Sequence, residues 1–279
     1  MSIGSDFDVT IVVPTRNSGR TLRACLESIR GQTRNCQIVV VDNFSADESR
    51  AIADELADVV LEMGPERSAQ RNAGAKVSQS SIIGFIDSDM LLGINVVDEV
   101  VASISSGTAS VVVPEVTIGE GFWAKVSAYE RSFYVGNDNV EAPRFFRRTV
   151  FSEAEGFDES MTGAEDWDLG LRTLKLGPRS RTQSVILHDE GRVRYFSLCR
   201  KKLYYASGLM KFGKKHGVEA LVNTTRRRWL RSLRALANPL GLGLVVLKAG
   251  EVVAVASGLL WLSLGGNIEL QRPTRNYDR

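Results

Sequence analysis

The sequence has few of the features that mark secreted, zinc-binding or triphosphate-hydrolysing proteins. Its three cysteines, Cys25, Cys36 and Cys199, lack metal-site spacing and cannot all pair with one another, which favours a reducing compartment. The N-terminus, MSIGSDFDVT, is polar and acidic, with no basic start and no apolar segment before a cleavage site, so we expect no secretory signal peptide. The sequence contains no Walker-type loop, zinc pattern or long tandem repeat.

The formal net charge is only +2, but it is distributed unevenly. Residues 200–234 contain eleven Lys and Arg against one acid, Glu219, a balance of +10 that leaves the rest of the chain at −8. This asymmetry indicates an anionic partner for that segment, either a membrane surface or a nucleic acid.

Short apolar runs alternate with amphipathic helical patterns in the first half of the chain. The predicted strands are residues 8–14, 37–41, 59–62, 82–86 and 110–113, and the predicted helices are residues 18–31, 46–56, 66–77 and 95–105. This alternation is typical of βαβ units, so we predict an α/β fold with a mainly parallel, Rossmann-like sheet flanked by helices. Further on, the sequence predicts a helix at 122–133, a strand around 145–151 and a strand at 184–188. Between these two strands, after residues 163–167, it predicts a helix that carries Leu169, Leu171 and Leu174 and ends at Gly177-Pro178.

Polar residues follow three of the predicted strands at the points where they end. The groups are Pro14-Thr15-Arg16-Asn17, Asp42-Asn43 and Asp87-Ser88-Asp89. Because the carboxyl ends of parallel strands share one edge, we expect the groups to converge there. Two carboxylates one residue apart suit Mg²⁺ or Mn²⁺, and an acid after the second strand can accept hydrogen bonds from a ribose or base. Arg67, Arg71 and Asn72, on the helix before the acidic strand, are suited to contact diphosphate oxygens.

Each of these residues also has an ordinary structural interpretation. An Asp-x-Asp pair or Asp42 alone fits a turn that caps a helix, and Arg71 alone fits a solvated helix charge. Together they indicate a nucleotide-diphosphate pocket with a metal ion.

These motifs resemble glycosyltransferase family 2, whose members are nucleotide-sugar transferases with the GT-A fold. The resemblance covers roughly residues 8–190 and rests on Val13-Pro14-Thr15-Arg16-Asn17, Val41-Asp42-Asn43 with Ser45 and Asp47, Gln70-Arg71-Asn72-Ala73-Gly74, Asp87-Ser88-Asp89, Gly156-Phe157-Asp158-Glu159 and Glu165-Asp166. Order and spacing together are specific, although each motif alone is not.

The resemblance implies roles for these residues. The nucleotide-sugar would be held by Pro14, Thr15, Asn17, Asp42, Arg71, Asp87 and Ser88. Asp89, with Asp87, would coordinate the Mg²⁺ or Mn²⁺ ion that bridges the diphosphate, and Asp166 would be the catalytic base. The chemistry agrees, because transfer needs a Lewis acid on the departing diphosphate and a base for the acceptor hydroxyl.

Three further residues are assigned to the site, each with an alternative. His188 is a candidate metal ligand, as a late histidine is in some GT-A enzymes, or an ordinary histidine. Glu165 and Trp167 are candidate acceptor contacts. Glu165-Asp166 also fits a helix N-terminus, where acids favour the macrodipole, and Trp167 also fits core packing.

The chain departs from the polymerising members of the family, because the Gln-x-x-Arg-Trp pattern is missing. We therefore expect transfer of a single sugar. Our hypothesis is an inverting, metal-dependent transferase. The alternatives are a polyprenyl-phosphate sugar transferase, a nucleotidyltransferase and a nucleotide-binding membrane adaptor without catalysis. A nucleotidyltransferase is disfavoured by the lack of a Gly-rich loop after the first strand, and an adaptor by the presence of a base.

The C-terminal part predicts a membrane-associated helical extension. We expect a GT-A domain at residues 1–195, a basic amphipathic segment at 196–236, an apolar helix at 237–266 and a polar tail at 267–279. The apolar helix begins at Asn238-Pro239, and its only charges, Lys248 and Glu251, can pair. It is long enough to span a bilayer, to lie in the interface or to be buried in a dimer.

The lipid-length helix beside the basic segment favours an anionic membrane over nucleic acid. The sequence therefore predicts an enzyme at the cytoplasmic face of the cell membrane. Its donor would be a nucleoside-diphosphate sugar, and its acceptor would be a glycan or a lipid-linked glycan.

Overall fold

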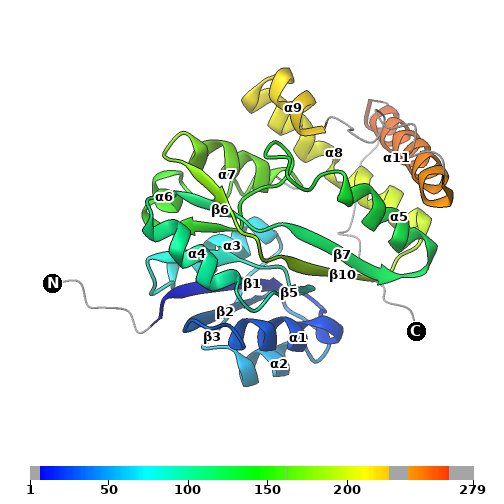
Figure 1. Ribbon diagram of the computed structural model, residues 1–279. Helices are drawn as coiled ribbons and strands as arrows, with labels where there is room; N and C mark the ends of the chain where they lie inside the picture. The colour runs from blue at the N-terminus through cyan, green and yellow to red at the C-terminus, as the bar shows by residue number, and fades with distance from the viewer. Residues whose placement is uncertain (1–6, 162, 226–237, 264–279) are drawn as a thin grey trace. The chain divides into compact units, whose positions relative to one another are not determined.

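The structure is a computed structural model that describes residues 7–161, 163–225 and 238–263 (Figure 1). The chain divides into two compact units. Unit 1 comprises Met1–Glu115, Glu141–Ser160 and Glu165–Asp189, and unit 2 comprises Val116–Val140, Met161–Ala164 and Glu190–Arg279. Strands β7 (Glu115–Glu120) and β10 (Ile186–Arg192) begin in unit 1 and continue into unit 2. The predicted domain boundary at residue 195 stays a prediction.

A seven-stranded sheet of order β3-β2-β1-β4-β8-β6-β9 forms the centre of unit 1. Its strands are β1 (Val9–Thr15), β2 (Cys36–Asp42), β3 (Val59–Glu62), β4 (Ile82–Phe85), β6 (Ser110–Val112), β8 (Phe145–Arg147) and β9 (Arg179–Arg181). β1 pairs in parallel with β2 and β4, and β2 with β3, whereas β8 runs antiparallel to β4 and β6. The predicted α/β fold with a mainly parallel sheet is confirmed.

Helices cover both faces of this sheet. One face packs against α1 (Gly19–Arg30), α2 (Ser49–Leu56) and α4 (Val96–Ser105), and the other against α3 (Arg67–Lys76), α6 (Arg148–Glu153) and α7 (Glu165–Leu174). Every residue of β1 is buried, as expected for a central strand with helices on both sides. Ile11 and Val13 join one core cluster and Val12 the other, because successive strand side chains point to opposite faces.

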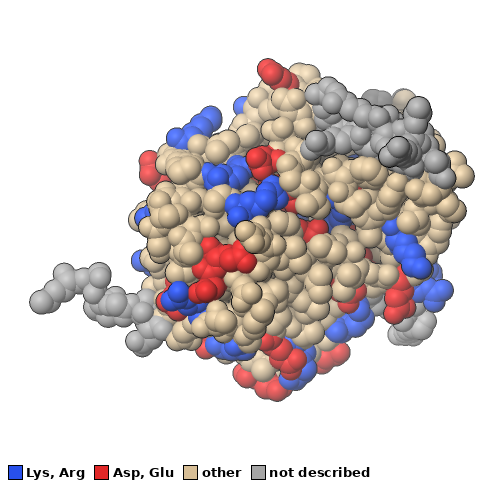
Figure 2. Space-filling view, viewed as in Figure 1, with Lys and Arg blue, Asp and Glu red and all other residues tan. Residues whose placement is uncertain are grey.

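The water-facing side of α1 and α2 carries charges of both signs. Arg23 on α1 pairs with Glu55 on α2, and Arg50 on α2 pairs with Asp54 one turn later. Figure 2 shows acidic and basic side chains interspersed over these two helices, at the bottom of the view. Such pairs are exposed, so each contributes little to stability and the surface serves mainly for solubility.

Several local predictions are wrong or incomplete. The strand predicted around residues 145–151 ends at Arg147, where α6 begins. Strands β5 (Met90–Leu92), β7 and β9 were not predicted. β5 and β9 have only three residues, which show no reliable period, and β7 has six residues. Ser18 occupies the N-cap position of α1, but its hydroxyl donates to the Arg16 carbonyl instead of capping the helix.

Unit 2 contains four described helices: α5 (Gly121–Ser132), α8 (Tyr195–His216), α9 (Val218–Thr225) and α11 (Pro239–Ser263). α11 packs against α5 and α8 around a small apolar core of Val126, Cys199, Leu244 and Leu247. Asn238 caps α11 as predicted, since its Oδ1 accepts a hydrogen bond from the Gly241 amide at 3.0 Å.

The predicted charge pair on α11 is confirmed, with Lys248 Nζ 2.8 Å from Glu251 Oε2. The basic cluster Arg226-Arg227-Arg228 with Trp229, Arg231 and Arg234 lies outside the described residues, as do Gly265-Gly266 and the predicted tail.

We expect Gly84→Ala to destabilise unit 1. Gly84 lies on β4 directly opposite Phe145 of β8, and an added Cβ would overlap the Phe145 ring, which is fully buried. Overpacking of this kind should lower the free energy of unfolding by about 1–3 kcal/mol, measured by urea denaturation.

The matched control shortens the Phe145 side chain, which the added Cβ would overlap. Phe145→Leu alone should also destabilise, but the double variant should lose less than the sum of the two single changes. Strictly additive losses would contradict the proposed overlap.

Candidate active site

The three predicted polar groups meet at one edge of the sheet. β1 ends at Thr15, which lies beside Asp42 at the end of β2, and β4, on the other side of β1, leads directly to Asp87. The parallel register therefore brings together residues that are up to 72 positions apart in sequence. Pro14 is buried within β1, opposite Val41.

The loops that follow β1 and β2 are tied to each other. Asp42 accepts hydrogen bonds from the Ser45 amide and hydroxyl, at 2.9 and 2.5 Å. The Ser45 hydroxyl in turn accepts from the Asn17 amide, and Asn17 Oδ1 accepts from the Ala46 amide, each at 2.8 Å. Asn17 has a φ of 49°, a left-handed conformation that asparagine tolerates better than most residues. These bonds shape the edge on which a nucleotide would lie.

Gln70 of α3 bridges the ends of β1 and β2. Its Nε2 donates to the Val41 carbonyl at 2.7 Å and to the Thr15 carbonyl at 3.2 Å. Among the described residues, the buried Thr15 Oγ1 and Gln70 Oε1 have no hydrogen-bond partner. Buried polar atoms normally have partners, so these two fit a site that a polar ligand completes.

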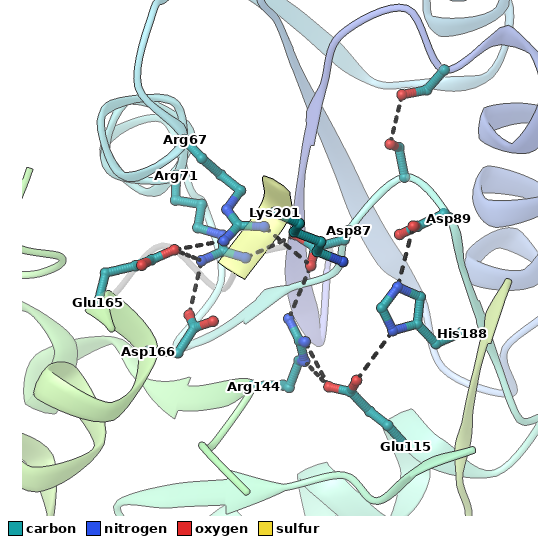
Figure 3. Close-up of polar contacts among 12 residues, drawn as sticks. Arg67, Arg71, Asp87, Asp89, Glu115, Arg144, Glu165, Asp166, His188 and Lys201 are labelled. Carbon is teal, nitrogen blue, oxygen red and sulfur yellow. Dashed lines mark hydrogen bonds and ion pairs between the residues drawn. The ribbon is translucent and has the colours of Figure 1, made fainter. Parts of the chain in front are cut away.

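Arg71 of α3 is the centre of the charged part of the site (Figure 3). Its side chain is fully buried, with Nη2 2.8 Å from Asp87 Oδ1 and Nη1 2.8 Å from Asp166 Oδ1. The guanidinium carbon lies 5.1 Å from the centre of the Phe157 ring, a cation–π contact. One guanidinium thus joins the acid after β4 to the acid at the start of α7.

Two more arginines face Asp87. Arg67 Nη1 and Arg144 Nη1 lie 3.7 and 3.6 Å from Asp87 Oδ2. Burial opposes ionisation of this carboxyl, but the charges of Arg71, Arg67 and Arg144 outweigh it and hold the pKa of Asp87 well below its usual range. Asp87 is therefore a permanent anion surrounded by cations. Its neighbour Ser88 donates a hydrogen bond to Ser18 Oγ at 2.8 Å.

Asp89 meets His188 because β10 pairs with β5. His188 lies opposite Met90 in this antiparallel pair, and its Nε2 is 3.2 Å from Asp89 Oδ2. On the other side of the ring, Nδ1 lies 3.4 Å from Glu115 Oε2. Glu115 Oε1 also accepts from Arg144 Nε and Nη2, at 2.8 and 2.6 Å. This chain of contacts orients the imidazole toward Asp89.

The first two residues of α7, both acidic, differ in their exposure. Glu165 is 2% exposed and Oε1 lies 2.7 Å from Arg67 Nη2, while the side chain of Asp166 is 33% exposed. Burial opposes ionisation of Glu165, but Arg67 and Arg71 lower the pKa of its carboxyl. Asp166 Oδ2 has no hydrogen-bond partner among the described residues. Trp167 is half-buried.

We call these residues the charged network: Arg67, Arg71, Asp87, Asp89, Glu115, Arg144, Glu165, Asp166 and His188. It contains five carboxylates and three guanidinium groups, so before His188 is counted it has an excess of two acidic side chains. That excess fits a divalent cation. Asp89 and His188 offer the oxygen and nitrogen donors that Mn²⁺ accepts.

The described residues contain no group of three His, Cys, Asp or Glu side chains arranged to hold a metal ion. Asp87, predicted as a ligand, instead faces three arginines. A two-residue site is still compatible with Mg²⁺, which commonly keeps several waters and binds through one or two carboxylates and substrate phosphates.

Arg144 and Glu115 were not identified from the sequence. Neither lies in a recognisable motif: Arg144 immediately precedes β8, and Glu115 begins β7. Their place in the network depends on strand pairing between segments far apart in the chain, for which the sequence carries no local signal.

A family model described as "Glycosyl transferase family 2" matches residues 10–158. The pre-mycofactocin glycosyltransferase of Mycobacterium tuberculosis strain H37Rv is 27% identical over 234 residues, which cover 76% of this chain and 49% of that protein. The putative glycosyltransferase EpsH of Bacillus subtilis is 38% identical over 88 residues, 29% of this chain and 26% of that protein. The chain thus spans at most about half the length of these relatives.

Solved structures share the fold. The S. aureus TarS 1–349 structure in complex with UDP-GlcNAc has a TM-score of 0.56 and 16% identity, and covers 94% of this chain and 93% of that one. The mannosyltransferase PcManGT from Pyrobaculum calidifontis, in complex with GDP-Man and Mn²⁺, has a TM-score of 0.57 and 17% identity, and covers 98% and 86%. These similarities confirm the predicted GT-A type of fold.

We expect Arg71→Met to destabilise the protein strongly. The change removes the fully buried cation nearest to the partly buried Asp87, and it also removes the partner of Asp166. Breaking a buried ion pair from one side typically costs about 3–5 kcal/mol, measured here as the free energy of unfolding in urea.

Arg34→Met is the matched control. Arg34 pairs with Asp98, but the two side chains are 44% and 51% exposed, so the loss should stay within about 1 kcal/mol. If both variants lost the same free energy of unfolding, the ion pairs of Arg71 would contribute no more to stability than an exposed pair does.

Proposed function

Since the chain belongs to glycosyl transferase family 2, we propose that it transfers a single sugar, with inversion, from a nucleoside-diphosphate sugar to an acceptor hydroxyl. The observation that carries this proposal is the double engagement of Arg71, which binds Asp87 through one nitrogen and Asp166 through the other. A donor-side carboxylate and a candidate base therefore lie on either side of one guanidinium group.

The proposed donor pocket is the edge formed by the ends of β1, β2 and β4. Its residues are Pro14, Thr15, Asn17, Asp42, Arg71, Asp87 and Ser88. Support comes from the buried hydroxyl of Thr15, which has no partner among the described residues, and from the Asp42 carboxylate in the tied loops. The TarS and PcManGT complexes contain UDP-GlcNAc and GDP-Man, which supports a nucleotide-sugar donor of either base.

We propose that Asp89 and His188 hold a Mg²⁺ or Mn²⁺ ion. Their separation of 3.2 Å, the excess of two acidic side chains in the network and the Mn²⁺ in the PcManGT complex support this. When bound, the ion supplies a Lewis acid for the negative charge of the departing nucleoside diphosphate. Glu115 acts through His188, whose ring it orients. Asp87 contributes as a fixed anion that positions Arg67, Arg71 and Arg144.

Asp166 is the proposed catalytic base. The acceptor oxygen attacks the anomeric carbon from the face opposite the diphosphate, and the bond from that carbon to the diphosphate oxygen breaks. The acceptor proton passes to Asp166. Its Oδ1 is held by Arg71, which leaves Oδ2 on a partly exposed side chain to receive the proton.

The acceptor is proposed to lie beside the first turn of α7. Half-buried Trp167 is placed to contact it directly, whereas the burial of Glu165 and its bond to Arg67 favour a supporting role for that residue. We further propose a lipid-linked glycan acceptor at the cytoplasmic face of the cell membrane. The support is α11, the one described helix long and apolar enough, by length and composition, to cross a membrane.

Nucleotide and metal binding can be tested without knowing the acceptor. We expect UDP or GDP to raise the melting temperature of the protein in the presence of Mn²⁺ but not of EDTA. Asp89→Ala should abolish the metal-dependent part of the shift, and Glu153→Gln, an exposed acid on α6, should not. A shift that survives in EDTA would contradict metal-assisted donor binding, and no shift with either nucleotide would contradict the donor pocket.

Asp166→Asn tests the base. Because positioned proton transfer contributes roughly 10²–10⁴-fold, turnover should fall by that factor, while the nucleotide-induced melting shift should stay close to that of the wild type. Release of nucleoside diphosphate from donor and acceptor is the readout.

Retained turnover in Asp166→Asn would point to an acceptor that is already an anion, such as a polyprenyl phosphate. Release of pyrophosphate from a nucleoside triphosphate would indicate nucleotidyl transfer instead, and donor binding without any turnover would indicate an adaptor.

A further inference from the structure

Helix α11 lacks the polar outer side of an ordinary surface helix. Its charged residues, Lys248 and Glu251, are only 6% and 7% exposed and face the rest of unit 2. From Leu242 to Ala256 the exposed positions recur every three or four residues and are aliphatic, and the exposed Ser257 follows them. We call them the outer stripe: Leu242, Val245, Val246, Ala249, Val252, Val253 and Ala256.

The outer stripe is a long apolar surface whose exposure to water is unfavourable. Leu242 is 62% exposed and Val253 64%, and the stripe extends about 21 Å at ~1.5 Å per residue. A helix that faces water normally turns its apolar side inward. Continuous apolar surface of this kind marks contact with a membrane or another protein.

The inward charges of α11 are held by a neighbouring helix. Lys248 Nζ lies 2.6 Å from Glu130 Oε1 on α5 and 2.8 Å from Glu251 Oε2. Removing α11 from α5 would separate Lys248 from Glu130 and would leave the Lys248–Glu251 pair facing hydrocarbon, where charged side chains are costly. Leu244 and Leu247, less than 2% exposed, pack on the same side.

The partner helices cannot accompany α11 into hydrocarbon. α5 carries the exposed Lys125, and α8 carries the exposed Arg200, Lys211, Lys214 and Lys215. Charged side chains are expensive in the bilayer core, so a span would require α11 to separate from both helices. The packing of unit 2 therefore favours a helix that lies in the membrane interface.

Aromatic side chains from α5 and α8 lie next to α11. Phe122, Trp123, Tyr195 and Phe196 form a chain of ring contacts with centroids 4.8–5.3 Å apart. The Tyr195 hydroxyl donates to the carbonyl of Val246 at 3.2 Å, and Phe196 is 81% exposed. Aromatic residues gather at the headgroup level of bilayers, because they have an apolar ring and tolerate a wet edge.

The positive charge of α8 indicates which partner the outer stripe binds. The exposed basic residues of α8 attract anionic headgroups, at about 1 kcal/mol for each Lys or Arg near the surface. A second copy of the chain would carry the same positive charges and be repelled. We infer that α11 binds the surface of an anionic bilayer as an interfacial helix, with the outer stripe in the lipid and without crossing it. This deepens the membrane association of the proposed function and is independent of sugar transfer.

Vesicle flotation of the full-length protein, without donor, tests the surface. We expect binding to phosphatidylcholine vesicles that contain phosphatidylglycerol, and at least tenfold weaker binding to phosphatidylcholine alone or at high salt. Val253→Glu should reduce binding at least tenfold, whereas Ile94→Glu, at a 58% exposed position in unit 1, should not. Lys211→Glu with Lys214→Glu should weaken binding to the anionic vesicles only.

The nucleotide-induced melting shift of Val253→Glu serves as the folding control and should match that of the wild type. Lost vesicle binding with an intact shift supports the inference and leaves the proposed function untouched. Equal binding by Val253→Glu and the wild type would overturn it. A wild-type dimer that Val253→Glu dissociates, without vesicle binding, would also overturn it in favour of a second copy.

Labelling with a membrane-impermeant maleimide separates an interfacial helix from a spanning one. Cysteines introduced by Glu219→Cys and Arg279→Cys lie in sequence before and after α11. In membrane vesicles of the expression host, an interfacial helix makes both reactive from the same side. Reactivity from opposite sides would show that α11 spans the bilayer. The native cysteines are buried.

Discussion

The burial of one guanidinium group determines how the site of unit 1 is assembled. Arg71 has no exposed surface, so its charge is tolerated only because Asp87 and Asp166 bind it at 2.8 Å and the Phe157 ring covers it. These partners come from the end of β4, the start of α7 and the loop between α6 and α7. The interaction therefore fixes three distant segments and the two carboxylates of the proposed chemistry at the same time.

The electrostatic balance of the charged network links its proposed ligands to each other. With five carboxylates and three guanidinium groups, the network is already negative, so a diphosphate alone would add to an unfavourable charge. A divalent cation at Asp89 and His188 would neutralise the excess and make the site receptive to the anion. In the proposed reaction, cation and donor therefore bind with positive coupling, and each should strengthen the binding of the other.

The sequence predicted the positions set by local patterns and missed those set by distant pairing. Buried apolar runs located β1, β2 and β4, and polar residues after each run located Thr15, Asp42 and Asp87. β5 is only three residues long, so no local pattern indicated that it would pair with β10 and bring His188 to Asp89; only the family resemblance suggested His188 as a metal ligand. Adjacent helix residues differ by about 100° in direction, but the pattern could not show that Glu165 faces inward and Asp166 outward.

Unit 1 and unit 2 both bury charge, with opposite consequences for their surfaces. In unit 1, inward carboxylates and arginines form a polar cluster at the edge of a sheet, where a charged ligand can compensate the imbalance. In unit 2, Lys248 pairs with both Glu130 and Glu251 between packed helices, and the exposed positions described on α11 carry no charge. Hydropathy alone cannot distinguish such a helix from a membrane span, since both kinds of helix consist mainly of apolar residues. The direction of the charged side chains distinguishes them. In the inferred interfacial placement, the ion pair between Lys248 on α11 and Glu130 on α5 would hold the apolar helix at the membrane surface.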